Sequence, residues 1–535
     1  MPDHVKSMDK KEKNLILKRL KKYAPFFLLI LTAAFLRIYL LRFRSVPLGD
    51  CCHYASFAKD FRRGDFSTIG TYWSPLWVGL ISLFSFVFGD VESSGYILSV
   101  FFGVMLIILA FIFAKRIFNE RVAYYTALLF TANLGLLNYS TRLFTESLYS
   151  FLLLGIAFLG WVSLERQKNS YFFLLGLLIG LTYAARPEAL AFLVVFSVLI
   201  LIAKRKKAFL TLLIFSMATA LFVLPVVIFY RLQYRIWTLG EKGTINFLYG
   251  EDVGIHYRDT NEYTEDYSEN LYLKKIKDKI KQKGILAYLV ENKFFIKRFF
   301  INYKRFFMLW PRQFLAIPRA GPWLSVIFFV LGSWVCLFVY KDRRKKYLYL
   351  LLFPFIIVTI LASCVVEERK IVPLIVFFVL IISCGVDWLQ TVLTNKPAKT
   401  LFFFLLAALI SISSIMAVRQ ASEVPNPIAL LMKDIGLWMR DHFSQEERFT
   451  LTEPYIQYYF YENNPDRSLG LIYFEDYKKL AQYMKHFGSK YLFIFKSLGY
   501  HNPAVNYLFN HEVDEFVLLK SFFRDDCEIR LYELK

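Results

Sequence analysis

The sequence predicts an all-α polytopic membrane protein, with about 11 transmembrane helices, juxtamembrane helices and a small C-terminal α/β domain outside the membrane. The chain has 535 residues, of which 56% are hydrophobic and 19% aromatic. Its mean hydropathy is +0.42, too high for a soluble protein of this length. Apolar runs near the length of a bilayer crossing recur through most of the chain. Only the tail after residue 417 has the pattern of a soluble domain.

The first apolar run spans residues 24–43 and contains Arg37. A charged side chain is costly in lipid, so we expect Arg37 to face the bundle or a polar cavity. A polar stretch follows at 44–72, and then a run at 73–89. The remaining runs near crossing length are 96–114, 123–139, 147–163, 171–185, 188–203, 208–230, 322–340, 347–363, 371–391 and 401–417.

The distribution of Lys and Arg decides whether 73–89 crosses the membrane. If this run lies along the outer surface, the short loops on the same side as the N-terminus hold 16 Lys and Arg, and the opposite short loops after residue 89 hold 4. A crossing at 73–89 would invert this bias, against the positive-inside rule. We therefore predict a juxtamembrane helix at 73–89, a cytoplasmic N-terminus, and a C-terminus outside the cytoplasmic (inner) membrane.

This topology divides the chain into a basic cytoplasmic N-terminus (1–23), a transmembrane domain (24–417) and an extracytoplasmic α/β domain (418–535). Within the transmembrane domain, the first outer loop is 44–95 and the large outer loop is 231–320. We expect an amphipathic helix near 270–300 in the large loop. In the tail we expect helices at 428–442 and 474–487, with strands at Phe449–Thr452, Tyr491–Phe495, Phe516–Leu519 and Glu528–Tyr532.

The formal net charge of +22 would suggest nucleic-acid binding in a soluble protein. Here the positive charge lies in short loops between spans, so we predict no nucleic-acid partner. The six cysteines have no disulfide-framework spacing. A disulfide between adjacent Cys51 and Cys52 would be strained, which favours thiols packed in the protein.

Ionisable groups gather at the predicted outer ends of spans, where they usually mark a site. Asp50 follows the first span, with Arg42 and Arg44 just before it. The other groups are Arg142 and Glu146 in the 140–146 loop, Arg186-Pro187-Glu188, and Glu367-Glu368-Arg369-Lys370.

Acids and cations on one face suit a transfer from a lipid-linked phosphosugar. A carboxylate accepts the proton of an incoming hydroxyl, and cations hold the phosphate of the leaving group. Asp50 and Glu146 are the predicted catalytic acids. The predicted substrate- or phosphate-binding residues are Arg369, Lys370, Arg186, Arg142 and Tyr54.

Each of these residues also has a structural interpretation. Asp50 can cap a loop, Glu146 can stabilise the start of the next helix, and Arg186 can precede a helix stop. Arg369 and Lys370 can anchor a span at the interface. His53 lies near Asp50 but has no further ligand at metal spacing. We therefore predict no metal ligand and no identified cofactor, and leave a divalent-metal requirement open.

Several short motifs follow one another in an order typical of one family. Gly49-Asp50 opens the first outer loop, which continues to Arg63-Gly64-Asp65-Phe66. The other motifs are Ser74-Pro75-Leu76 to Phe88-Gly89, Ala114-Lys115-Arg116-Ile117-Phe118-Asn119, Glu146 after the third crossing, and Arg369 before Pro373.

With these motifs the chain resembles the type C, polyprenyl-phosphate-dependent glycosyltransferases, in particular the branch of protein O-mannosyltransferases and lipid A aminoarabinose transferases. The resemblance is best over 30–200 and fair over 360–385. It implies that Asp50 is the general base or orients the acceptor, that Glu146 is the second acid, and that Arg369 contacts the donor phosphate. Two residues depart from the family: Cys51 replaces the usual Glu, and Ser74 replaces the Lys of the aminoarabinose transferases, which argues against that donor.

The resemblance implies an inverting transfer of a hexosyl or pentosyl group from a polyprenyl-phosphate donor. The acceptor is an envelope glycan, a lipid or a protein on the outer face of the membrane. Two rival interpretations stay open. A transporter or flippase for lipid-linked glycans would carry charges deep in its spans and have two related halves. A non-catalytic scaffold would leave Asp50 and Glu146 unexplained.

Overall fold

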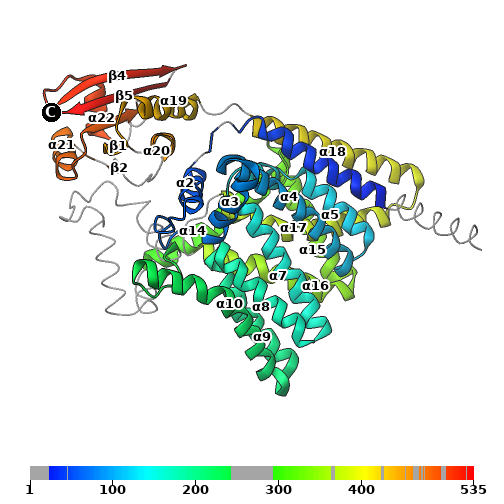
Figure 1. Ribbon diagram of the computed structural model, residues 1–535. Helices are drawn as coiled ribbons and strands as arrows, with labels where there is room; N and C mark the ends of the chain where they lie inside the picture. Colours follow the sequence, from blue (N-terminus) through cyan, green and yellow to red (C-terminus); the bar gives the residue numbers. More distant parts are fainter. Residues whose placement is uncertain are drawn as a thin grey trace, which may run out of the picture.

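The protein is described by a computed structural model. It comprises a large helical bundle and a small sheet domain near the C-terminus (Figure 1). The structure describes residues 23–44, 46–47, 49–242, 293–362, 368–422, 427–451, 454–461, 469–470, 474, 476–495, 502–525 and 527–535.

Every apolar run predicted to cross the membrane lies on helix. In the part of the chain that the structure describes, eight helical stretches are long and apolar enough to cross a bilayer. The first is Tyr23–Leu41. The helices of the predicted crossings that follow are α4 (Val91–Ile117), α5 (Glu120–Ala132), α6 (Leu134–Tyr139), α7 (Glu146–Arg166), α8 (Asn169–Ala185), α9 (Leu190–Lys204), α10 (Ala208–Tyr234), α15 (Ala320–Trp334), α16 (Arg344–Ala362), α17 (Glu368–Val392) and α18 (Lys396–Ser422).

Eight is fewer than the expected number of crossings because several runs form short or interrupted helices. The run at 123–139 divides at Asn133, whose Oδ1 accepts a hydrogen bond from the amide of Leu136 at the start of α6. Helices α9 and α10 are joined by a 3-10 turn, η2 (Arg205–Lys207), and count as one stretch. Helix α8, with 17 residues, is too short to count among the eight. The predicted helix at 73–89 is α3 (Pro75–Phe88).

Helix α17 is the centre of the bundle. Almost all of its apolar window is buried, and it packs against α5, α7, α15 and α16. Two glycines bring α15 very close to α17. A Cβ atom on Gly332 would lie 2.2 Å from the carbonyl oxygen of Ile381, and one on Gly385 would lie 2.8 Å from the amide nitrogen of Gly332. Such small residues allow helix backbones to approach closely inside a membrane.

Arg37 confirms the expectation for a charge inside the first span. Its side chain is 1% exposed. Its Nε donates a 2.8 Å hydrogen bond to Ser140 Oγ, and its Nη1 donates to the carbonyl oxygen of Ala33 at 3.0 Å. The guanidinium therefore faces the bundle and is held by protein acceptors, as the cost of a charge in lipid demands.

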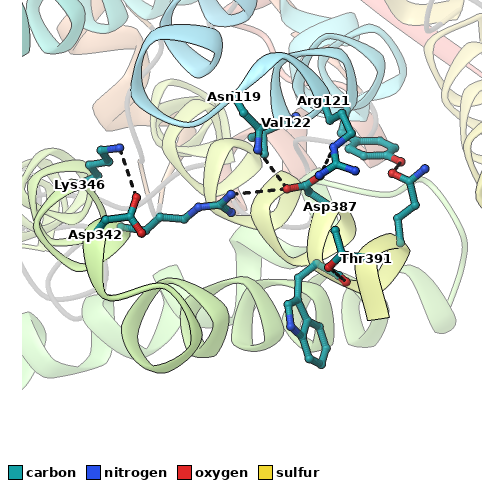
Figure 2. A network of polar contacts seen from close by, with 11 residues as sticks. Asn119, Arg121, Val122, Asp342, Lys346, Asp387 and Thr391 are labelled. Atoms are coloured by element: carbon teal, nitrogen blue, oxygen red, sulfur yellow. Dashed lines mark hydrogen bonds and ion pairs between the residues drawn. The ribbon is translucent and has the colours of Figure 1, made fainter. Parts of the chain in front are cut away.

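Loops with many Lys and Arg lie together at one end of the bundle. Figure 2 shows Asp387, near the end of α17, inside a network of cations. Asn119 Nδ2 donates to Asp387 Oδ2 at 3.3 Å. Arg343 Nη2 lies 3.6 Å from Asp387 Oδ2, and Arg121 Nε lies 3.2 Å from Asp387 Oδ1. This buried carboxylate joins three loops that the charge count places on one side.

The C-terminal domain carries a five-stranded sheet in the order β2-β1-β3-β5-β4. Strand β1 pairs in parallel with β2 and β3, and β3–β5 and β4–β5 are antiparallel. The bounds of its elements are α19 (Pro427–His442), β1 (Phe449–Leu451), α20 (Pro454–Phe460), β2 (Leu469–Gly470), α21 (Tyr477–His486), β3 (Tyr491–Phe495), α22 (Pro503–Asn510), β4 (Phe516–Arg524) and β5 (Cys527–Leu534).

The expected helices and strands of the tail are confirmed over the described residues, and β2, α20 and α22 are additional. Thr452 of the first expected strand and Glu475 of the second expected helix lie outside the described residues. Helix α20 packs against α2 (Asp50–Arg62), and Tyr458 donates a 2.9 Å hydrogen bond to Glu92. The C-terminal domain therefore sits beside the first loop (Figure 1). Of the amphipathic helix expected near 270–300, residues 270–292 lie outside the described residues, and the remainder lies on α14 (Lys293–Leu309).

Replacing Asp387 should destabilise the bundle. Asp387→Asn leaves Arg343, which is 8% exposed, without its counter-charge. Breaking a buried ion pair costs about 3 kcal/mol. The nearby Asp342→Asn is a matched control, because Asp342 is exposed and pairs with Lys346 at 3.8 Å, which is worth less than about 1 kcal/mol. Thermal unfolding of the purified proteins measures both, and equal losses would contradict the role of Asp387.

Candidate functional site

Six of the seven predicted site residues, Arg186 among them, line one small cavity. The cavity lies at the end of the bundle opposite to Asp387. Asp50 and Tyr54 come from α2, Glu146 from the start of α7, and Arg369 and Lys370 from the start of α17. The cavity is also lined by Tyr72, Phe144, Thr145 and Lys242, and its volume is about 10 Å³. That volume is room for about one water molecule.

Asp50 begins α2, directly after Gly49, whose φ of +56° is a conformation that side chains with a Cβ rarely adopt. The carboxylate thus lies at a helix N-terminus, where the helix dipole favours a negative charge. Arg369 Nη1 donates a short hydrogen bond to Asp50 Oδ2. About a quarter of each of these two side chains remains exposed. The ion pair joins α2 to the central helix α17, although the two residues are 319 positions apart.

Glu146 forms a second and more deeply buried ion pair. Its Oε1 lies 2.9 Å from Arg186 Nη2, and the two side chains are 2% and 7% exposed. The guanidinium of Arg186 also lies over the ring of Tyr149 at 5.0 Å. Glu146 Oε2 is buried and accepts no hydrogen bond from the described residues. This oxygen retains an acceptor position beside the cavity, and a buried oxygen of this kind usually has a partner.

Tyr54 lies one helical turn after Asp50 and is almost fully buried. Burial, and then the charge of Asp50, raises the pKa of its hydroxyl well above the usual range. The phenol therefore stays protonated and can donate a hydrogen bond. Lys370 is also buried, at 7% exposure, which sets it apart from a cation that anchors a span by reaching into water.

Arg142 is the predicted site residue that the structure does not bring to the cavity. Its Nε donates a 3.2 Å hydrogen bond to Asn138 Oδ1, an atom that also accepts from Arg44 Nη2 at 3.0 Å. Arg142 does not line the cavity with Asp50. A substrate-binding role was predicted for Arg142 only because of its position in the 140–146 loop. In the structure its side chain bonds to Asn138, at the start of that loop.

Lys242 is the site residue that sequence reasoning missed. It lies after α10, in the long loop where no motif marks it, and its side chain is 8% exposed. Glu241 positions it: the amide of Glu241 donates to Thr71 O at 3.0 Å, and Thr71 Oγ1 donates to Glu241 Oε2 at 2.6 Å. The ammonium lies over the rings of Tyr72 at 5.2 Å and Trp73 at 5.7 Å. Its aromatic neighbours in the first outer loop were the only available signal.

The cysteines and His53 of the same loop have packing roles. Cys51 and Cys52 form no disulfide with any described cysteine, and both are buried in α2. The ring of His53 stacks on Trp73 at 4.9 Å. Within the described ranges, no group of three or more His, Cys, Asp or Glu could hold a metal ion.

An apolar groove of about 710 Å³ lies between α14, α15, α16 and α17. Its walls include Trp310, Phe329, Leu351 and Phe378. Helix α17 connects this groove to the small cavity, because Phe378 follows Arg369 by nine residues. At about 1.5 Å per residue that distance is roughly 13 Å along the helix.

Paired acids and cations lie beside an apolar groove, on a helical bundle with a small C-terminal sheet domain. Residues 74–230 match the family model described as dolichyl-phosphate-mannose-protein mannosyltransferase. A comparison with curated protein sequences found no match.

The fold is shared with two solved membrane enzymes. The oligosaccharyltransferase AglB from Archaeoglobus fulgidus, solved with an inhibitory peptide and a dolichol-phosphate, has a TM-score of 0.58 and 14% identity; the alignment covers 90% of this chain and 70% of that chain. ArnT from Cupriavidus metallidurans, bound to undecaprenyl phosphate, has a TM-score of 0.59 and 11% identity over 95% and 98% of the two chains. The predicted family resemblance and membrane fold are confirmed.

Lys242→Met should stabilise the protein at neutral pH. Burial, with a contribution from the charge of Arg186, lowers the pKa of Lys242 to about 8, below about 10.4 in an unfolded chain. Below pH 8 the folded state therefore bears the cost of a buried charge, and this cost diminishes as the pH rises toward 10.4.

The thermal unfolding midpoint of Lys242→Met, relative to the unchanged protein, should be higher at pH 7, and the difference should shrink by pH 9.5. Lys206→Met, at an exposed position, is the matched control and should give no such trend. A difference that is the same at both pH values would contradict the burial of the charge.

Proposed function

We propose that this protein is an integral membrane glycosyltransferase that moves a sugar from a polyprenyl-phosphate carrier to an acceptor hydroxyl at the outer face of the cytoplasmic membrane. The observation that carries this proposal is the convergence of Asp50, Glu146, Arg186, Arg369 and Lys370 on one cavity. These residues come from distant parts of the chain. The two solved relatives bound to dolichol-phosphate and undecaprenyl phosphate support the class of donor.

In the proposed step, the acceptor oxygen forms a bond to the anomeric carbon of the sugar. The bond between that carbon and the phosphate oxygen breaks, and the phosphate leaves with the electron pair. Asp50 accepts the proton of the acceptor hydroxyl, as a general base. Attack from the side opposite the phosphate inverts the sugar carbon, and the transferred group is a hexosyl or pentosyl unit.

The cations of the cavity balance the charge that the leaving phosphate gains. Arg369 now donates from Nη1 to the proposed base, and we propose that this donor turns to the phosphate when the donor lipid binds. Donor binding therefore frees the carboxylate at the moment when the phosphate replaces it on Arg369. Lys370 and Lys242 add buried positive charge. Glu146, held by Arg186, offers its second oxygen to a sugar hydroxyl.

The apolar groove between α14 and α17 suits the isoprenoid tail of the donor. Its lining is aromatic and aliphatic, so burying a hydrocarbon chain there is favourable at about 25 cal/mol per Å². Because α17 carries both Arg369 and Phe378, one helix positions the phosphate and the tail. Helix α20 of the C-terminal domain packs against α2, and Lys242 lies over Tyr72, which supports a role in acceptor recognition for this domain and for the loop that carries Lys242.

Asp50→Asn should lower the transfer rate by about 10²- to 10⁴-fold, the usual contribution of a general base. The measurement uses the protein reconstituted with a polyprenyl-phosphate sugar and follows release of polyprenyl phosphate together with labelled product. Asp65→Asn is the matched control, because Asp65 lies in the same loop and, among the described residues, its carboxylate accepts hydrogen bonds from Ser67 alone. It should retain full activity. Undiminished transfer by Asp50→Asn would overturn the assignment of the base.

Filling the groove should weaken the binding of long-chain donors. Val330→Trp adds bulk at an exposed position of the groove wall, and the KM for a long polyprenyl-phosphate donor should rise about tenfold with little change in kcat. The neighbouring Ile327→Trp is the control, because Ile327 is equally exposed but does not line the groove. Equal effects of the two substitutions would contradict the placement of the tail.

A further inference from the structure

A second large cavity, of about 960 Å³, lies on the other side of η3 (Trp310–Gln313) from the apolar groove. Its lining comes from α6, the end of α14, η3, the segment from η3 to α15, the first half of α15, the start of α17 and the end of α18. Phe307 and Val326 line both spaces and thus form the wall between them. The proposed reaction leaves this cavity without a role.

The cavity is strongly cationic. Three guanidiniums line it, those of Arg312, Arg319 and Arg419, against one carboxylate, that of Glu368. Glu368 Oε2 already accepts a 2.9 Å hydrogen bond from Gln313 Nε2. Arg312 and Arg319 form no ion pair with a carboxylate in the described ranges. The cavity therefore carries excess positive charge that a phosphate or carboxylate would balance.

The position of the cavity points to a ligand that arrives in the membrane. Arg319 and Trp323 lie at the start of α15, and Arg419 lies near the end of α18. Trp323 is 73% exposed, and both helices present exposed aliphatic and aromatic side chains along their length. Trp and Arg at span ends mark the level of the lipid headgroups. An amphiphile can enter from the bilayer there, with its anionic group among the arginines.

The cavity also adjoins the proposed active site. Glu368 lines the cationic cavity, and the next residue, Arg369, lines the cavity with Asp50. The lining of the cationic cavity therefore reaches the residue of α17 that precedes the cation bound to the proposed base. The apolar groove approaches the same helix from the other side of Phe307.

We propose that the cationic cavity binds the phosphate-bearing headgroup of a membrane-borne acceptor, in a site separate from that of the donor lipid. The identification of the ligand as an acceptor rests on the proposed function, whereas the anionic-lipid site does not. Two lipids then reach the start of α17 by separate routes. Interfacial anchoring alone would account for single arginines at span ends, but not for three that surround one cavity.

The test measures the binding of fluorescent phosphatidic acid to the full-length protein in detergent, with phosphatidylcholine of the same chain length as comparison. Phosphatidic acid should bind at least tenfold more tightly. Arg312→Gln/Arg419→Gln should lose about tenfold or more in affinity, because two charge-assisted contacts are removed. Arg42→Gln/Arg235→Gln, two exposed arginines outside the cavity, should leave the affinity unchanged.

Equal losses in the two double variants, or equal binding of the two lipids, would overturn the site. Inorganic phosphate should compete only at concentrations far above those of the lipid; competition at equal concentration would overturn a lipid-borne ligand. Saturating farnesyl phosphate should not displace phosphatidic acid. If it does so competitively, the cavity belongs to the donor and the second site is wrong.

The variant Asp50→Asn separates this inference from the proposed function. Asp50 does not line the cationic cavity, so Asp50→Asn should bind phosphatidic acid with unchanged affinity whether or not it transfers sugar. Failure of the unchanged protein to transfer sugar would contradict the function, and undiminished transfer by Asp50→Asn would contradict only the assignment of the base; both would leave the lipid site standing. Loss of lipid binding in that variant would contradict the separation of the two sites.

Discussion

The ion pair between Asp50 and Arg369 is the contact on which the arrangement of the site depends. It joins the first loop of the chain to the helix at the centre of the bundle. Because both side chains remain partly exposed, the pair is screened by solvent and costs less to separate than a fully buried one. A pair of this kind holds the site closed around a cavity the size of one water molecule, yet an incoming phosphate can open it.

Ion pairs fix helix α17 at both ends, through cations at its start and through a carboxylate near its end. At one end Arg369 and Lys370 face the proposed site, and at the other Asp387 is held by Arg121 and Arg343. Between them the helix is apolar and packed on every side. Glycine contacts with α15 leave little room for rotation. This rigidity keeps the cations in position while the loops around them bind substrates.

The sequence predicted the bundle well because a lipid environment demands long apolar helices, and these are visible in composition alone. It also brought together most of the charged residues that line the small cavity, because charges at span ends are rare and the charge count assigned Asp50, Glu146 and Arg369 to the same side. Arg142 lies in the same loop as Glu146, but its side chain bonds to Asn138. The direction of a side chain depends on local geometry and cannot be predicted from the sequence pattern.

The roles of two other residues could not be predicted from the sequence, for different physical reasons. Lys242 reaches the site because Glu241, next to it, bonds to Thr71, a tertiary contact across 170 positions of the sequence. Asp387 lies within an otherwise apolar run, so the sequence assigned it to a membrane span. Its cationic partners come from two other loops, so its role emerges only when the helices are packed.

The proposed reaction requires that a donor phosphate replaces Asp50 on Arg369. A structure of the protein with a polyprenyl phosphate bound would show this in the distance between Arg369 Nη1 and Asp50 Oδ2. We expect this ion pair to be broken, with the phosphate on Arg369 and Lys370 and the tail in the groove lined by Phe378. A bound phosphate elsewhere, with the ion pair intact, would contradict it.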